Sequence, residues 1–221
     1  MFTSRPTYDI FRTLKLTDPF QRGEDVYALQ TAIVGLGVDV DTDGILGPAT
    51  SKAIKTVQDK LNITVDGLAG GGTQTAIVRR EANAARGNHN LPVGLTFGQI
   101  SHESSCRLGI YTPTYADGSW DVGATQRNSA LYDIKESFTV PFVIDFLGAY
   151  ERSYYDKFAG VKDTARRWAL AAGAWNRPAY AGWIANEEGA HVPRSNTKQP
   201  TTAQRVSLEA YMASATAFLE L

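Results

Sequence analysis

The chain has 221 residues, 43% of them hydrophobic and 20% charged, and a formal net charge of -1, which is the composition of an ordinary globular protein. Neither half carries the excess of Lys and Arg that nucleic-acid binding requires, so we expect no nucleic-acid partner. A polymer would instead be held by hydrogen bonds and by stacking on the 10 Tyr, 4 Trp and 9 Phe. The single cysteine, Cys106, excludes an internal disulfide.

The first hundred residues contain a duplicated pattern. Residues 43–54 and 66–77 both read D-G-x-x-G-x-x-T-x-x-A-I, at a period of 23 residues. Asp-Gly predicts a turn, Thr50 and Thr73 are the predicted N-caps of two helices, and the Ala and Ile that follow fall on a buried face. Residues 24–33 predict a further helix with apolar residues at helical spacing. Together these segments predict a small three-helix module.

The module resembles a known family. Residues 26–30 match V-x-x-L-Q, and the first D-G block runs on to Val57-Gln58, where the family has Phe-Gln, so the region from 22 to 80 is similar to the peptidoglycan-binding domain of wall hydrolases. The resemblance implies that peptidoglycan lies beside the turns and contacts Tyr27, Asp43 and Gly44. Asp43 and Gly44 also suit a purely structural turn in any helix pair.

A domain boundary is predicted between residues 86 and 87. Residues 79–86 finish a helix, and residues 87–92 are polar, contain Gly87 and end in Pro92. The predicted domains are therefore 1–86, with its core at 22–80, and 87–221.

The second domain is predicted to be mainly helical. The one strand signal is Asp117-Gly118 within residues 111–128, a dipeptide typical of β-hairpins. The expected fold class is thus mainly α, with a three-helix domain followed by an α+β domain that has one small hairpin. The helical patterns cover residues 93–103, 140–158, 164–175 and 202–221, the last with Val206, Leu208, Tyr211, Met212, Ala215 and Phe218 on its apolar face.

Glu103 stands at the end of a predicted helix that carries Phe97 and Ile100. Cleavage of a glycosidic bond needs a protonated carboxylic acid on one side of the bond and an ionised carboxylate on the other. An acid keeps its proton in apolar surroundings. Glu103 is therefore a candidate acid, with Asp121 following 18 residues later.

Three motifs then occur in the order expected of lysozyme relatives. The segment His102-Glu103-Ser104-Ser105 resembles F-E-S-N of animal-type lysozymes and E-S-x-x of lytic transglycosylases. Residues 117–129 follow the D-G-S-T-D-Y-G-I-L-Q-I-N-S hairpin of animal-type lysozymes without a gap. Residues 171–176, A-A-G-A-W-N, are similar to the A-A-Y-N motif of transglycosylases. On these motifs the domain is identified as a member of the lysozyme-like superfamily.

The resemblance implies roles for named residues. Glu103 is the general acid and Asp121 the second carboxylate, with Asp117 in reserve because goose-type relatives place an Asp at about that distance before the Gln. Val122 and Ala124-Thr125 depart from the lysozyme hairpin, which affects the sugar contacts more than Glu103. The expected substrate-binding residues, by amide hydrogen bonds or by stacking, are Gln126, Asn128, Trp120, Trp175, Asn176 and Tyr180.

Each of these residues also has a structural interpretation. Asp117 before Gly118 is typical of a turn, Gln126 and Asn128 suit bonds to the hairpin backbone, and Trp175 suits a core position.

The predicted function is a muramidase that hydrolyses the β-1,4 bond between N-acetylmuramic acid and N-acetylglucosamine. A lytic transglycosylase, which forms 1,6-anhydro ends, is the nearest alternative, and a wall-binding protein without activity is a third. A zinc-dependent wall amidase or peptidase would need ligands from His89, His102, His191, Cys106 and acidic residues, but no H-E-x-x-H motif is present. We expect no cofactor and no metal.

A binding domain ahead of a catalytic domain resembles the architecture of bacteriophage endolysins, with a bacterial or prophage autolysin as the alternative. Neither an export signal nor an 18-residue apolar run is visible. The resemblance implies residence in the host cytoplasm until lysis and then in the periplasm and wall, and peptidoglycan glycan strands as the partner. We expect a monomer without stable membrane association.

Overall fold

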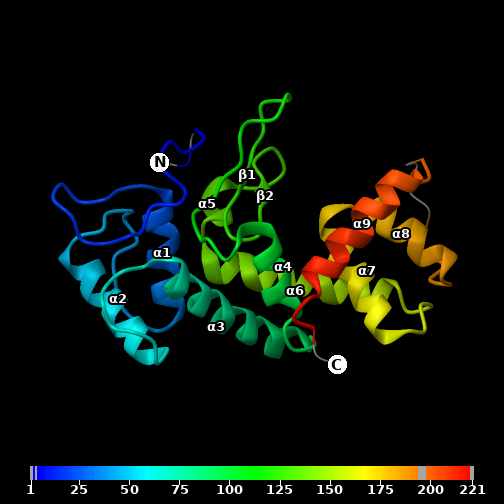
Figure 1. Ribbon diagram of the computed structural model, residues 1–221, viewed down its shortest axis with the longest axis horizontal. Coiled ribbons are helices and arrows are strands. Elements are labelled where there is room, and N and C mark those ends of the chain that lie inside the picture. Colours follow the sequence, from blue (N-terminus) through cyan, green and yellow to red (C-terminus); the bar gives the residue numbers. More distant parts are fainter. Residues whose placement is uncertain (1, 3, 194–197, 220–221) are drawn as a thin grey trace. The chain divides into compact units, whose positions relative to one another are not determined.

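The computed structural model describes residues 2, 4–193 and 198–219 and is mainly helical (Figure 1). One small antiparallel hairpin is present in these residues, in agreement with the predicted fold class. Along the described chain no helix is both long and apolar enough to cross a membrane. The elements are α1 (Glu24–Gly35), α2 (Pro48–Lys60), α3 (Gly71–His89), α4 (Leu95–Ser104), β1 (Asp121–Val122), β2 (Arg127–Asn128), α5 (Ile134–Ser137), α6 (Val140–Lys157), α7 (Thr164–Asn176), α8 (Pro178–Glu187) and α9 (Thr202–Ala215).

The chain forms two compact units, each discontinuous in sequence. The first unit comprises residues 1–81 and 103–144, and the second comprises residues 82–102 and 145–221. Helix α3 continues to His89, three residues beyond the predicted end of its helix at residue 86. Compactness alone does not identify which segments fold independently, so the domain boundary between residues 86 and 87 stays a prediction.

A buried glutamine organises the first D-G turn. Gln30 is fully buried in α1, and its Nε2 donates hydrogen bonds to Asp43 Oδ1 (2.9 Å) and to Thr50 Oγ1 (3.1 Å). The Gly44 amide donates to Gln30 Oε1 (2.8 Å), in a turn where Gly44 has a φ of 71°. One side chain thus satisfies the polar groups of a turn that would otherwise be buried without partners.

The second D-G turn repeats this arrangement. Gln58, buried in α2, donates to Asp66 Oδ1 (2.7 Å) and to Thr73 Oγ1 (3.1 Å), and it accepts from the Gly67 amide (2.8 Å). The sequence duplication therefore corresponds to a duplicated hydrogen-bond network. Each network is centred on a glutamine of the preceding helix, Gln30 or Gln58, which we call the glutamine hub.

Thr50 does not cap its helix as predicted. Helix α2 begins at Pro48, and its N-cap is Gly47, which makes no side-chain capping bond. Proline suits the first helical position because its ring fixes φ and it has no amide hydrogen to leave unpaired. The predicted burial of Ala53 and Ile54 is confirmed.

Residues of the N-terminal segment contact both α1 and the chain that precedes the hairpin. Arg12 forms a two-pronged ion pair with Asp25 through Nε (2.7 Å) and Nη2 (2.6 Å). The Tyr8 hydroxyl donates to the Gly109 carbonyl (2.7 Å). A Cβ at Gly109 would lie 2.3 Å from Asp25 Cβ, so only glycine permits this close approach. Burial raises the pKa of Asp25, and the ion pair with Arg12 opposes that shift.

In the second unit, α7 packs against both α8 and α9. The predicted apolar face of the last helix is confirmed in part, because Leu208, Tyr211, Met212 and Ala215 are buried. Val206 is 64% exposed, and Phe218 lies beyond the end of α9 at 47% exposure, although its ring still contacts Phe97. The prediction is wrong for these two residues, so the buried apolar face of the last helix is narrower than the sequence pattern indicated.

Candidate functional site

Glu103 lies in the last turn of α4 and is half-buried. The two residues after the helix, Ser105 and Cys106, have φ of 50° and 60°, a left-handed backbone that ends the helix abruptly. The side chains of Cys106 and Leu108, which follow this turn, are both buried. Glu103 is thereby fixed at a sharp change of chain direction.

The chain from Tyr111 to Asn128 makes two successive turns. At the first, Gly118 has a φ of 84°, and the Tyr115 amide donates to the Ser119 carbonyl (2.7 Å), so the predicted Asp-Gly turn is present. The two strands, however, flank the next turn, with Asp121 opposite Asn128 and Val122 opposite Arg127. The hairpin is therefore displaced from the predicted dipeptide, because the pairing before Ser119 is too short and irregular to form strands.

Asp121 is held by two hydrogen-bond donors. The Tyr115 hydroxyl donates to Oδ2 (2.6 Å), and Asn128 Nδ2 donates to Oδ1 (3.0 Å). The side chain is half-buried. Its two oxygens are therefore oriented by neighbours on both sides, the arrangement that a carboxylate needs to act as a fixed negative charge.

Tyr115 is bonded to one of the two predicted catalytic carboxyl groups and is affected by the charge of the other. Its pKa is raised, chiefly by the hydrogen bond to Asp121 and then by partial burial, with further contributions from the charges of Asp121 and Glu103. Glu103 and Asp121 thus act on the same phenol. The sequence interpretation missed Tyr115, and the available signal was an aromatic residue six positions before Asp121 across a D-G turn.

Asp117 stabilises the Asp-Gly turn through hydrogen bonds to Ser119. Its Oδ1 accepts hydrogen bonds from the Ser119 hydroxyl (2.7 Å) and amide (3.0 Å), which lower the pKa of this exposed carboxyl group. A lowered pKa keeps this group ionised, which is compatible with the second-carboxylate role for which Asp117 was the reserve candidate, but both bonds serve the turn. Its geometry matches the turn interpretation of the sequence.

The predicted sugar-binding side chains of the hairpin bond mainly to the hairpin itself. Gln126 Nε2 donates to the Gly123 carbonyl (2.9 Å), and Asn128 bonds to Asp121 and, through Oδ1, to the Ala130 amide (2.9 Å). Trp120 is half-buried, and its Nε1 has no hydrogen-bond partner among the described residues.

The remaining predicted sugar contacts belong to the second unit. Trp175 is half-buried, and its ring lies 5.1 Å from that of Tyr150. Asn176 ends α7 and is exposed. The Tyr180 hydroxyl accepts a hydrogen bond from Gln204 (2.8 Å). Trp175 therefore has aromatic neighbours, and Asn176 is open to solvent.

The predicted wall contacts at the first D-G turn have structural partners. Tyr27 is only 7% exposed, with its ring 4.9 Å from that of Phe2. Gly44 is buried, and Asp43 is exposed but bonded to Gln30. These three residues do not form an open surface together.

A pocket of about 380 Å³ lies instead beside the second D-G turn, where the sequence pattern assigned no contacts. The Leu68 amide and then Gln58 lower the pKa of Asp66, so its exposed carboxylate is ionised at this pocket. The sequence signal near the pocket was the two extra glycines of the second copy, which reads Gly70-Gly71-Gly72 where the first reads Gly47-Pro48-Ala49. The lining includes Thr13, Ile63, Thr64, Asp66, Leu68 and Gly72.

The possible metal ligands predicted from the sequence do not gather. Over residues 2, 4–193 and 198–219, no three His, Cys, Asp or Glu side chains lie close enough to hold a metal ion. His89 bonds to Asp145 (2.9 Å), and His102 bonds to Ser214 (2.8 Å).

Comparison with known proteins identifies one part of the chain. Residues 22–77 match the family described as a peptidoglycan binding domain. No curated protein gives a significant match to the chain. The predicted peptidoglycan-binding domain at the N-terminus is thereby confirmed, and it indicates interaction with the bacterial cell wall.

Proposed function

We propose that the chain is a muramidase, which hydrolyses the β-1,4 bond between N-acetylmuramic acid and N-acetylglucosamine in peptidoglycan. The observation that carries this proposal is the placement of Asp121 by the Tyr115 hydroxyl (2.6 Å), on a phenol whose pKa both Asp121 and Glu103 raise. Glycoside hydrolysis requires one carboxyl group on each side of the scissile bond, and the influence of Glu103 and Asp121 on the same phenol supports their pairing. The peptidoglycan-binding match at residues 22–77 supports the choice of polymer.

In this mechanism Glu103 donates its proton to the glycosidic oxygen as the bond to the anomeric carbon breaks. Asp121, oriented by Tyr115 and Asn128, faces the positive charge that develops on the sugar. Water then supplies a hydroxyl group to the anomeric carbon and a proton that restores Glu103. Carboxyl groups about 5 Å apart would favour retention and roughly 6.5–9.5 Å inversion, because inversion needs room for the water.

The pocket beside the second D-G turn is the proposed wall contact. It is open, it carries the ionised carboxylate of Asp66, and it lies within the matched residues apart from Thr13. Binding there raises the effective concentration of the catalytic residues at the polymer, so weak affinity suffices. The structure supports this location better than the buried surroundings of Tyr27.

The test is cleavage of purified peptidoglycan by Glu103→Gln, Asp121→Asn and Asp117→Asn, with the exposed loop residue Asp39→Asn as a matched control. Loss of a general acid is expected to slow release of soluble fragments by about 10²- to 10⁴-fold. Asp121→Asn should also lose most activity, and Asp117→Asn should lose little. Full activity in Glu103→Gln, combined with inhibition by EDTA, would identify a metal-dependent amidase instead.

Mass spectrometry of the fragments separates hydrolysis from the transglycosylase alternative. A muramidase leaves reducing ends, whereas a lytic transglycosylase leaves 1,6-anhydro ends that are lighter by one water. Anhydro ends would assign the same Glu103 to transglycosylation and leave Asp121 without a role as second catalyst.

A further inference from the structure

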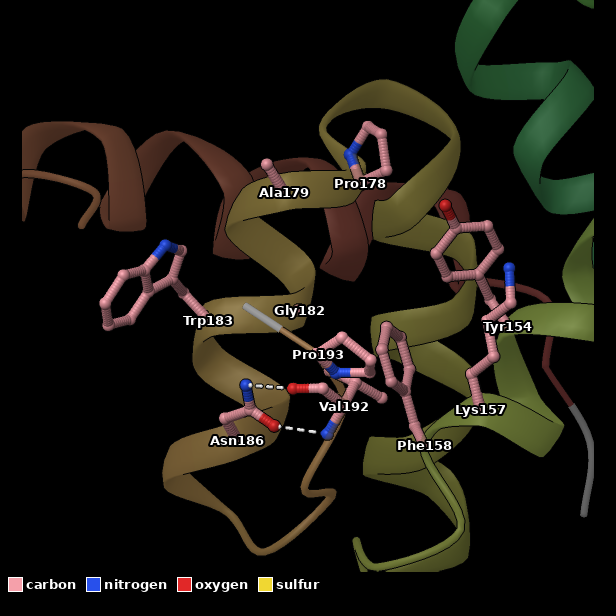
Figure 2. A pocket seen from close by; sticks show the side chains of 10 residues that line it. All are labelled: Tyr154, Lys157, Phe158, Pro178, Ala179, Gly182, Trp183, Asn186, Val192 and Pro193. Carbon is pink, nitrogen blue, oxygen red and sulfur yellow. Dashed lines mark hydrogen bonds between the residues drawn. The ribbon is translucent and has the colours of Figure 1, made fainter. Parts of the chain in front are cut away.

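The second unit contains a pocket of about 440 Å³ that no part of the proposed mechanism uses (Figure 2). It lies between the C-terminal end of α6, one face of α8 and the chain at Val192 and Pro193. Its volume is in the range of pockets that bind small molecules. The lining residues that matter for its chemistry are Tyr154, Lys157, Phe158, Gly182, Trp183 and Val192.

The walls of the pocket are fixed in place. Asn186 of α8 donates from Nδ2 to the Val192 carbonyl (3.0 Å) and accepts from the Val192 amide (2.6 Å), so this side chain holds the Val192 backbone against α8. Phe158 is 1% exposed, and its ring lies beside Pro193 between Trp183 and Tyr154 in Figure 2. A Cβ at Gly182 would have only Val192 in ordinary contact at 3.7 Å, so this glycine keeps the space open.

An aromatic row leads to the pocket, formed by Phe146, Tyr150 and Tyr154 of α6 with Trp175 of α7. The α6 residues follow one another at four-residue spacing and therefore share one face of the helix. The Tyr150 ring lies 5.1 Å from that of Trp175 and 4.6 Å from that of Tyr154. All four residues are half-buried, so the row combines packing with exposed ring surface, as sugar-stacking residues do.

The pocket has a positive end. Among the described residues that line it, Lys157 alone carries a charge, and its Nζ lies 4.2 Å from the centre of the Tyr154 ring. Lys157 is exposed, so its ammonium group can pair with an anion at the rim. The rest of the lining includes the apolar side chains of Phe158 and Val192. A ligand of matching chemistry has a carboxylate next to small alkyl groups.

We propose that this pocket binds the acidic stem peptide of peptidoglycan, an inference that rests on the proposed function. The stem peptide carries alanine methyl groups and free carboxylates, which match the apolar side chains of the lining and Lys157 respectively. Sugars that lie on the aromatic row would place the attached peptide at the pocket. The pocket thus recognises strands that carry peptides, and bare glycan lacks the group it binds.

The test uses the full chain labelled with 5-fluorotryptophan, in a Glu103→Gln background so that no ligand is cleaved. Fluorine NMR then follows four resonances, and the Trp183 signal is assigned with Trp183→Phe. A disaccharide with its stem peptide should shift the Trp183 signal, whereas N-acetylglucosamine oligomers should not. Gly182→Leu, which fills the pocket, should abolish the shift.

Lys157→Gln should weaken the peptide-dependent shift about threefold in Kd, the size expected for an exposed ion pair, and the exposed control Lys162→Gln should leave it unchanged. Equal shifts with the neutral oligomers, or an unmoved Trp183 signal, would overturn the inference. These outcomes are independent of catalysis: retained wall cleavage by Glu103→Gln would contradict the proposed muramidase and leave the pocket assignment standing.

Discussion

The Tyr115 hydroxyl donates a 2.6 Å hydrogen bond to Oδ2 of Asp121 across the Asp-Gly turn. Because this bond stabilises the charged carboxylate, Tyr115 is a positioning residue for Asp121. Tyr115 is 45% exposed, so solvent screens part of the interaction.

Tyr115→Phe is expected to lower kcat for wall cleavage by about three- to tenfold, because a hydrogen bond to a charged group is worth about 1 kcal/mol once exposure is allowed for. KM should change little if the bond acts on Asp121 alone. An unchanged kcat, or a loss that appears in KM alone, would contradict this role.

Glu151 is a titrating group that affects the stability of the protein. It is fully buried in α6, and Thr96 donates a 2.6 Å hydrogen bond to its Oε2. Burial raises its pKa from 4.5 to about 8, against the effect of the Thr96 bond. Between these pH values the folded protein keeps a proton that the unfolded chain has released.

Stability from this group is therefore fully present below pH 4.5 and is lost as the pH rises to about 8. We expect the free energy of unfolding to fall by a few kcal/mol over this window, and Glu151→Gln to remove most of the fall. Urea denaturation of the wild-type protein and of Glu151→Gln at pH 5, 6.5 and 8 measures how the free energy of unfolding of each depends on pH. Parallel pH dependence in the two proteins would show that Glu151 is not the group responsible.

The two glutamine hubs should contribute similarly to stability. Gln30→Leu and Gln58→Leu each leave a turn with unpaired polar groups next to a buried helix face. Each is expected to lower the free energy of unfolding by about 2–4 kcal/mol, from the loss of several hydrogen bonds near 1 kcal/mol each. Chemical denaturation measures the change, with the exposed Gln199→Leu as control. A loss of unfolding free energy smaller than that of Gln199→Leu would show that water takes over the hydrogen bonds of the glutamine side chain.

Wall binding should depend on the pocket beside the second turn. Gly72 lies in the first turn of α3 and lines the pocket, and a Cβ added there would have no atom within 4 Å, so Gly72→Tyr can place a bulky group at the pocket. We expect the Glu103→Gln, Gly72→Tyr protein to sediment several-fold less with insoluble peptidoglycan. Gly87→Tyr is the matched control, because Gly87 is also helical and has open space around it. Equal sedimentation of the two variants would place the contact elsewhere.

Periodicity and turn chemistry account for much of the fold that the sequence predicted. The helices α4, α6 and α7 were expected within two residues of their bounds, because an apolar face at helical spacing is a local signal. Helix α8 was not predicted. It begins at Pro178 directly after α7, and most of its residues are small or apolar on every side, so no clear amphipathic period marks it.

The site was less predictable because its parts are set by contacts distant in sequence. Glu103 and Asp121 were predicted from motifs, but the phenol of Tyr115 becomes relevant only when the turn brings it back to Asp121. Likewise, the contact of Tyr8 with Gly109 joins residues 101 positions apart, which no local pattern indicates. The pocket at the second turn was missed because its lining includes Thr13 of the N-terminal segment.

The two glutamine hubs determine which side chains of the turns can be replaced. Gln30 and Gln58 satisfy the inward-facing polar groups of their turns, so the outward-facing side chains carry little of the folding requirement. At the proposed wall contact, a replacement of the Thr64 or Leu68 side chain would change the pocket lining without removing a hydrogen bond of Gln58.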